Sequence, residues 1–275
     1  MKAPILETPR LRIPRLGLGT WALRGAEAQR AVEGALGLGY RHIDTAAMYG
    51  NEEAVGAGLA ASGLKREDIF LTTKVWWTDL APDALRASAE ASLKRLATPY
   101  ADLVLIHWPA KGMDLAASLG ALQRLKADGL ARAVGVSNFP PGLLRRALGL
   151  GIAEIAALQV ECHVYLWQEP LAALCREHGL ALTAYSPVAK ASVNDDPVMR
   201  AIAAKHGGSP VQVALAWLLA QENLVAIPKS GRMEGQRDNL AACSLTLDAA
   251  DMAAIAALPK DRRLVNPEFA PDWAA

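Results

Sequence analysis

The stretch Gly39-Tyr40-Arg41-His42-Ile43-Asp44-Thr45-Ala46-Ala47-Met48-Tyr49-Gly50-Asn51-Glu52 places a carboxylate at the end of a short apolar segment. We expect a strand over Tyr40–Ile43 that runs into Asp44, followed by a turn that carries Tyr49. A helix then begins, for which Asn51 is a suitable N-cap. This part of the chain therefore brings a carboxylate and a phenol to the end of one strand.

Two later apolar segments end in a similar way. Ile69–Val75 carries Lys74 near its end, and Leu103–Ile106 runs directly into His107. An aspartate, a tyrosine, a lysine and a histidine thus arrive at the ends of three successive strands. We infer that the fold brings these strand ends together into one mouth.

Composition narrows the class of protein. The chain has 275 residues, 52% of them hydrophobic, which suits a single α/β barrel of about 250 residues. A net charge of +1 gives no electrostatic reason to expect a nucleic-acid or membrane partner. The three cysteines are too scattered for a disulfide framework, which predicts reduced thiols. The chain starts without the apolar run of a signal peptide and has no segment of ~20 apolar residues. We therefore expect a soluble cytoplasmic protein. We expect a monomer whose partner is a small molecule.

Short apolar strands alternate with helices along the chain, which is typical of a parallel sheet covered on both faces. The expected strands are Arg15–Leu18, Tyr40–Ile43, Ile69–Val75, Leu103–Ile106, Ala131–Val136, Ala157–Val160, Leu180–Ala184 and Leu224–Ile227. The expected helices are Ala26–Leu38, Glu52–Ala61, Pro82–Leu96, Leu115–Ala127, Pro141–Leu150, Gln168–His178, Pro197–Lys205, Pro210–Ala220, Gly235–Ala241 and Ala249–Ala257.

A closed barrel and an open doubly wound sheet both fit this order. A doubly wound nucleotide domain would show G-x-G-x-x-G after its first strand, whereas Gly17-Leu18-Gly19-Thr20-Trp21-Ala22 lacks the third glycine. We therefore predict a single (β/α)8 TIM barrel domain over residues 1–275, with an irregular C-terminal tail from Arg262 onward. The segment Pro4–Ile13 is expected to form a short hairpin or an extended lead-in.

The four polar residues suggest a reaction. Neighbouring strands lie about 4.8 Å apart, so Lys74 would stand between Asp44 and His107 and could reach Tyr49. Its ammonium would lower the pKa of the phenol, and the carboxylate would balance the ammonium. Tyr49 and His107 could then polarise a carbonyl and protonate it. Because none of them supplies a hydride, a reductase would need a nicotinamide.

Each of these residues alone is more often a cap, a rim aromatic, a solvated cation or a core histidine. Their joint placement on consecutive strand ends is the stronger signal. The other histidines show no metal-ligand spacing, so we predict no metal site. Cys162 and His163 are adjacent and would point to opposite sides of an extended chain, so we do not interpret them as a dyad.

The sequence resembles the aldo-keto reductase family over essentially its whole length. The matching segments, in order, are Gly39–Glu52, Leu71–Lys74, Leu103–Pro109, Gly135–Phe139, Gln159–His163, Tyr185–Pro187 and Ile227–Ser230. The resemblance implies a (β/α)8 barrel that binds NADPH without a Rossmann domain. It also implies a catalytic tetrad of Asp44, Tyr49, Lys74 and His107, with Tyr49 as the proton donor.

The resemblance further implies cofactor contacts. Thr20 and Trp21, with Gly19 and Asp44 beside them, would lie near the nicotinamide riboside. The carboxamide would be bound by Ser137, Asn138 and Gln159, and the ring by Tyr185. Ser186 and Val188 would line the pyrophosphate.

The segment Lys229-Ser230-Gly231-Arg232 precedes a helix, where backbone N–H groups favour anions. Its cations suit the 2′-phosphate of NADPH, and Asn239 completes the expected cofactor set. Lys190 in place of a glycine, and Gly235 where the family often has an arginine, depart from the pattern and leave NADH use open.

Within the family, the tail Asp261–Pro267 and its ending Ala270–Trp273 resemble bacterial diketogluconate and methylglyoxal reductases. The expected substrate pocket is walled by aromatic and catalytic side chains, namely Trp21, Tyr49, Trp76, His107, Trp108 and the tail's Phe269. The loop after His107 is short, which predicts an open pocket with broad specificity.

Three functions are compatible with these residues. The preferred one is NADPH-dependent reduction of small aldehydes and ketones, including methylglyoxal and 2,5-diketogluconate. The second is a barrel aldolase or isomerase that uses Lys74 as a Schiff-base amine. The third is a non-catalytic, cofactor-bound regulatory protein of the same fold.

Overall fold

The computed structural model describes residues 3–274, so three positions of the predicted domain 1–275 lie outside the described residues. The main sheet has eight parallel strands in the order β10-β9-β8-β7-β6-β5-β4-β3. The strands are β3 (Leu18–Gly19), β4 (His42–Asp44), β5 (Phe70–Val75), β6 (Ala101–Ile106), β7 (Ala131–Ser137), β8 (Ile155–Glu161), β9 (Ala181–Tyr185) and β10 (Leu224–Ala226).

The sheet closes into a barrel through the residues just before β3. Leu16 forms a parallel bridge with Ala226, and the Gly17 N–H donates to the Ala226 carbonyl at 2.9 Å. The first strand was predicted over Arg15–Leu18, but the regular strand is Leu18–Gly19 and the segment before it contributes only this bridge. Side chains are excluded at Gly19, since a Cβ there would lie 2.7 Å from the Ile227 carbonyl oxygen. The close approach of the two backbones at the seam therefore requires a glycine at position 19.

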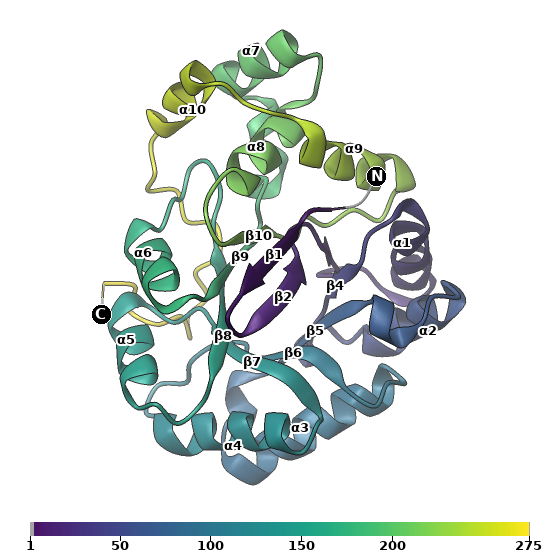
Figure 1. The fold of residues 1–275 in the computed structure, drawn as a ribbon, viewed down its shortest axis with the longest axis vertical. Coiled ribbons are helices and arrows are strands. Elements are labelled where there is room, and N and C mark those ends of the chain that lie inside the picture. The colour runs from purple at the N-terminus through teal and green to yellow at the C-terminus, as the bar shows by residue number, and fades with distance from the viewer. Residues whose placement is uncertain (1–2, 275) are drawn as a thin grey trace.

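Helices surround the barrel, as Figure 1 shows. They are α1 (Gly25–Leu38), α2 (Glu52–Ala61), α3 (Pro82–Arg95), α4 (Leu115–Ala127), α5 (Pro141–Gly149), α6 (Glu169–His178), α7 (Pro197–His206), α8 (Pro210–Leu219), α9 (Met233–Ala241) and α10 (Ala249–Ala256). They agree with the predicted helices to within two residues at each end. Among residues 3–274, no helix is both long and apolar enough to cross a membrane.

The N-terminal segment forms a hairpin of β1 (Ile5–Thr8) and β2 (Leu11–Pro14), which settles the two alternatives for Pro4–Ile13. Figure 1 shows it lying across the middle of the barrel. Leu11 and Ile13 pack with the inward side chains Leu103 and Leu105 of β6. The hairpin thus adds side chains to the barrel interior.

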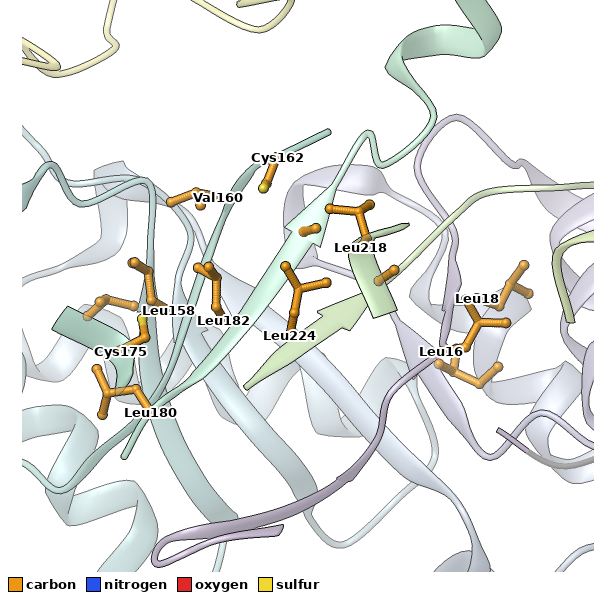
Figure 2. Close-up of a cluster of buried hydrophobic side chains, with 14 of the residues drawn as sticks. Leu16, Leu18, Leu158, Val160, Cys162, Cys175, Leu180, Leu182, Leu218 and Leu224 are labelled. Atoms are coloured by element: carbon orange, nitrogen blue, oxygen red, sulfur yellow. The ribbon is translucent and has the colours of Figure 1, made fainter. Parts of the chain in front are cut away.

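A second core fills the space between the sheet and the helices. In Figure 2, Leu158 and Val160 of β8 and Leu182 of β9 lie in the same cluster as Cys175 of α6 and Leu218 of α8. Because side chains alternate along a strand, Gln159 and Glu161 of β8 point to the opposite side, into the barrel. This alternation decides which residues can reach the site.

Candidate active site

Three of the four predicted tetrad residues lie at the same end of the parallel sheet. Asp44 is the last residue of β4, Lys74 is next to last in β5, and His107 follows β6 directly. Tyr49 ends a 3-10 helix, Ala47–Tyr49, in the loop between β4 and α2. The barrel register therefore brings together residues that are far apart in the sequence.

Lys74 is the centre of the cluster. Its Nζ donates to Asp44 Oδ1 at 2.5 Å, to the Thr45 carbonyl at 2.8 Å and to the Tyr49 hydroxyl oxygen at 3.3 Å. The Lys74 residue is 0% exposed and Asp44 is 1% exposed. The ammonium thus has three acceptors within hydrogen-bond reach, which is what a buried charge requires.

Gln159 completes the environment of Asp44. Its Nε2 donates to Asp44 Oδ2 at 2.8 Å, so each carboxylate oxygen has a donor. The resemblance assigned Gln159 to the cofactor alone, and nothing in the sequence links it to Asp44, which lies 115 residues earlier. The contact exists because β8 and β4 face each other across the barrel.

Charge and burial set the pKa values at the cluster. Burial acts to lower the pKa of Lys74, but Asp44 and Tyr49 outweigh it, so that pKa is raised above its ordinary value. Burial also raises the pKa of Tyr49, and the Lys74 charge offsets only part of that rise. Burial therefore outweighs Lys74 in setting the pKa of Tyr49, although the ammonium lowers that pKa as we expected from the sequence.

His107 lies beside the phenol. Its ring centroid is 5.6 Å from that of Tyr49 and 5.1 Å from that of Trp76. Burial first, and the Lys74 charge second, hold the pKa of His107 well below its usual value, so the imidazole is neutral at pH 7. Its buried Nδ1 has no hydrogen-bond partner among the described residues.

Aromatic side chains surround this cluster. Trp21, which is 50% exposed, packs edge-on to Tyr49 with ring centroids 4.9 Å apart. Trp76 and Trp108 each contact Phe269, at 5.3 and 5.5 Å between centroids. The predicted pocket residues therefore share one wall. Trp77, which was not predicted, belongs to the same wall and stacks on Phe269 with ring centroids 5.4 Å apart.

Of the residues predicted to bind the carboxamide, Ser137 ends β7, Asn138 follows it directly and Gln159 lies within β8. The Asn138 Nδ2 donates to the His107 carbonyl at 2.9 Å and to Ser137 Oγ at 3.0 Å. The Tyr185 hydroxyl donates to Asn138 Oδ1 at 2.9 Å. Asn138 therefore links Ser137 and Tyr185 to the backbone of His107.

The loop before α1 is fixed to the same strand ends. The Thr20 Oγ1 donates to the Asp44 carbonyl at 3.0 Å, and Asn51 Nδ2 donates to the carbonyls of Thr20 and Leu23. Asn51 occupies the N-cap position of α2 as predicted, but its side chain makes no capping bond. Its amide instead holds the loop that carries Thr20 and Trp21.

The loop after β9 is conformationally unusual. Ser186, Ala189, Lys190 and Ala191 all have positive φ values, between 48° and 67°. L-residues with a side chain rarely adopt this region. Ser186 and Val188, the predicted pyrophosphate residues, are thus part of a strained turn.

The segment before α9 carries exposed cations. Lys229 and Arg232 are exposed, and no ion pair involves either of them within residues 3–274. Ser230 Oγ accepts from the Arg232 N–H at 3.2 Å, and a Cβ at position 235 would lie 2.6 Å from Ser230 Oγ. Gly235 therefore leaves room for this turn, while Asn239 is buried within α9.

Comparison with known proteins places this geometry in a family. The sequence model of the aldo/keto reductase family matches residues 15–260. The chain belongs to the aldo/keto reductase family. This reductase is 42% identical over 267 residues to methylglyoxal reductase DkgB of Escherichia coli O157:H7, covering 96% of this chain and 100% of the relative. It is 40% identical over 253 residues to an aldo-keto reductase of Mycolicibacterium smegmatis, covering 92% of each chain.

Solved structures agree with this assignment. A structure provisionally named 2,5-diketo-D-gluconic acid reductase B superposes on the reductase with a TM-score of 0.93 at 40% identity, covering 96% of this chain and 94% of that one. The aldo-keto reductase of Bombyx mori, solved in complex with NADP, gives a TM-score of 0.91 at 33% identity, covering 97% and 96%. The (β/α)8 fold and the family resemblance are confirmed.

The described residues contain no group of three or more His, Cys, Asp or Glu side chains placed to hold a metal ion. Within the candidate site, the reductase instead presents a phenol, an ammonium and a neutral imidazole side by side. These groups can hydrogen-bond an oxygen atom and donate a proton to it.

Proposed function

We propose that this reductase uses NADPH to reduce small aldehydes and ketones to alcohols, with Asp44, Tyr49, Lys74 and His107 as its catalytic tetrad. One observation carries the proposal: Lys74 Nζ lies 2.5 Å from Asp44 Oδ1 and 3.3 Å from the Tyr49 hydroxyl, beside a neutral His107. Such a group can polarise a carbonyl but contains no hydride.

The residues at the mouth fit a nicotinamide dinucleotide. Ser137, Asn138 and Gln159 offer hydroxyl and amide groups of the kind a carboxamide needs, and the Tyr185 ring lies next to them. Gly19, Thr20 and Trp21 lie at the end of β3, and Ser186 and Val188 follow β9. When bound, the dinucleotide would supply the hydride that the tetrad lacks.

Tyr49 is the proton donor in this mechanism. A carbonyl oxygen placed between Tyr49 and His107 would accept hydrogen bonds from both side chains. As the carbonyl carbon gains the hydride, the Tyr49 hydroxyl gives its proton to the oxygen. Lys74 stabilises the phenolate that remains, and Asp44 keeps the ammonium in place. Because the pKa of Tyr49 is raised, its phenol is protonated at neutral pH and has a proton to donate.

The preference for NADPH rests on the segment before α9. Lys229 and Arg232 are exposed cations at the start of a nine-residue helix, where backbone N–H groups add to the attraction for a phosphate. Ser230 and Asn239 complete the proposed adenosine end of the site. NADH lacks the 2′-phosphate and would bind more weakly.

The alternatives receive less support. A Schiff-base mechanism requires a neutral amine, whereas Asp44 and Tyr49 raise the pKa of Lys74 and keep it protonated. A purely regulatory role would not require the four tetrad residues to be placed together.

The proposed substrates are small dicarbonyls and keto sugars. The relatives named for methylglyoxal and diketogluconate support this class, and the wall of Trp21, Trp76 and Trp108 offers apolar contact. We further propose a cytoplasmic monomer that acts as one domain over residues 1–275. The free thiols of Cys162, Cys175 and Cys243 suit a reducing compartment.

The experiment is to follow NADPH and NADH oxidation with methylglyoxal, 2,5-diketogluconate and an aromatic aldehyde. The proposal predicts turnover of at least one dicarbonyl, with a higher kcat/KM for NADPH than for NADH. Absence of turnover on all three carbonyls with either cofactor would contradict it.

A further inference from the structure

The C-terminal tail reaches the candidate active site from outside the barrel. Phe269 in the tail contacts Trp76, Trp77 and Trp108, with ring centroids between 5.3 and 5.5 Å apart. Trp76 in turn contacts His107 at 5.1 Å. One tail side chain is therefore a single aromatic layer away from a tetrad residue.

The tail begins with two contacts, from the Arg262 N–H to the Tyr165 carbonyl at 3.0 Å and from Arg263 Nη2 to Gln168 Oε1 at 3.4 Å. Beyond them, one carboxylate holds the tail to the barrel. Glu161, the last residue of β8, is 0% exposed. Its Oε1 accepts from the Leu264 N–H at 2.8 Å, and its Oε2 accepts from the Val265 N–H at 2.9 Å. Among the described tail residues 264–274, these are the hydrogen bonds that join the tail to the barrel.

The chemistry of this contact suits a carboxylate side chain. Two consecutive backbone N–H groups point at two oxygens of one side chain, and His163 Nε2 lies 3.0 Å from Oε1. A buried carboxylate is stable when it accepts several hydrogen bonds. An amide in its place would have to present an NH2 group to one of the donors. The site is thus specific for a glutamate or a close equivalent.

Glu161 also lies on the strand that supports the tetrad. Side chains two residues apart on a strand share a face. Leu158 and Val160 lie in the outer cluster that Figure 2 shows, so the alternating side chains of Gln159 and Glu161 both point into the barrel. Gln159 holds Asp44, and Glu161 pairs in register with Tyr185. Strand β8 therefore holds Asp44 through Gln159 and holds the tail through Glu161.

We propose that Glu161 is a positioning residue that holds the tail over the site, so that Phe269 forms part of the substrate wall. Through this contact Glu161 sets the preference for aromatic over small carbonyl substrates. The inference rests on the proposed carbonyl reductase function. Within residues 3–274, the Glu161 carboxylate makes no hydrogen bond to the tetrad or to the predicted cofactor contacts, so we expect its effect to be on substrate binding.

The test compares Glu161→Gln, Phe269→Ala and the double variant with wild type. The substrates are methylglyoxal and phenylglyoxal, two dicarbonyls of which the first carries a methyl group and the second a phenyl group in its place. Glu169→Gln is the matched control, because Glu169 lies at the start of α6, is exposed and bonds only Trp167 and Arg176. For each variant we would measure kcat, KM and the Kd of NADPH.

The expected result is a KM for phenylglyoxal that rises about tenfold in Glu161→Gln and in Phe269→Ala, the scale of one lost aromatic contact. The KM for methylglyoxal and the Kd of NADPH should stay within about twofold to threefold. The double variant should be no worse than Phe269→Ala alone, because both changes act through the same side chain.

Two results would overturn the inference. One is an equal loss with both substrates, or weaker NADPH binding, which would show a general structural role. The other is a full additional effect of Glu161→Gln in the Phe269→Ala background.

Should Glu161→Gln fail to fold, Val265→Pro removes one of the two N–H donors without changing Glu161, and it must give the same selective rise in KM for phenylglyoxal. A wild type that reduces neither substrate would instead refute the proposed function itself.

Discussion

Lys74 Nζ lies 2.5 Å from Asp44 Oδ1 in a site where both side chains are almost completely buried. Breaking such a pair leaves one charge without a partner in a medium of low dielectric constant. The pair therefore links the stability of the fold to the chemistry of the site.

Asp44→Asn tests the structural side of that pair. We expect it to lower the free energy of unfolding by about 3–5 kcal/mol, because the Lys74 ammonium loses its counter-charge. Glu7→Gln is the control, since Glu7 forms an exposed pair with Arg12 and its loss should cost less than about 1 kcal/mol. Urea denaturation followed by circular dichroism measures both, and equal small losses would contradict the account.

The buried side chain of His42 should make the free energy of unfolding depend on pH. Burial first lowers the pKa of His42 to about 4, and its Nδ1 has no partner among the described residues. The unfolded chain, with a histidine pKa near 6.5, takes up a proton first as the pH falls, so stability present above pH 6.5 is lost toward pH 4. Between pH 7 and pH 5 this loss is about 2 kcal/mol.

His42→Gln removes this titration. The variant should lose about 2 kcal/mol less than wild type between the two pH values, as measured by denaturation at each. The same acid-induced loss in both proteins would show that His42 is not responsible.

The backbone conformation of Lys190 leads us to expect that a substitution there stabilises the fold. Ala189, Lys190 and Ala191 are three consecutive residues with positive φ, a region that glycine adopts without the Cβ clash. Lys190→Gly should raise the free energy of unfolding by about 0.5–1 kcal/mol, because the strain relieved exceeds the entropy cost of glycine. Thermal unfolding measures the change. Lys94→Gly within helix α3 is the opposite control and should destabilise.

The cations before α9 predict the cofactor preference. Replacing both Lys229 and Arg232 by methionine should raise the Kd of NADPH about tenfold or more and leave that of NADH within about twofold, since only NADPH carries the 2′-phosphate. Cofactor fluorescence titration at two salt concentrations gives both constants. Lys65→Met changes an exposed lysine far from α9 in sequence and serves as control. Equal weakening of both cofactors would contradict the assignment.

Much of this architecture could be predicted from the sequence. The strands that carry Asp44 and Lys74, and the strand that runs into His107, are apolar runs with a polar residue at the end. That pattern predicted that these residues and Tyr49 would come together, and the family resemblance gave them their proposed roles. Gln159 and Glu161 could not be assigned in the same way. Their partners Asp44 and Leu264 lie 115 and 103 residues away, and only the closed register brings them into contact.

The direction of the net pKa shift of Tyr49 also could not be predicted from the sequence. The charge of Lys74 was visible, but the loss of water around the phenol depends on packing. Desolvation is the larger of the two effects in the folded protein. The first strand was misplaced for a related reason, because Leu16 pairs with Ala226 across a seam that local sequence does not reveal.

Tyr49→Phe tests the central claim most directly, because it removes the proposed proton donor and keeps the ring that packs on Trp21. The measurement is kcat for methylglyoxal reduction, with the Kd of NADPH determined on the same sample. The account predicts a loss of at least about a hundredfold in kcat with the Kd of NADPH within about twofold of wild type. A variant that still reduces methylglyoxal at the wild-type rate would contradict it.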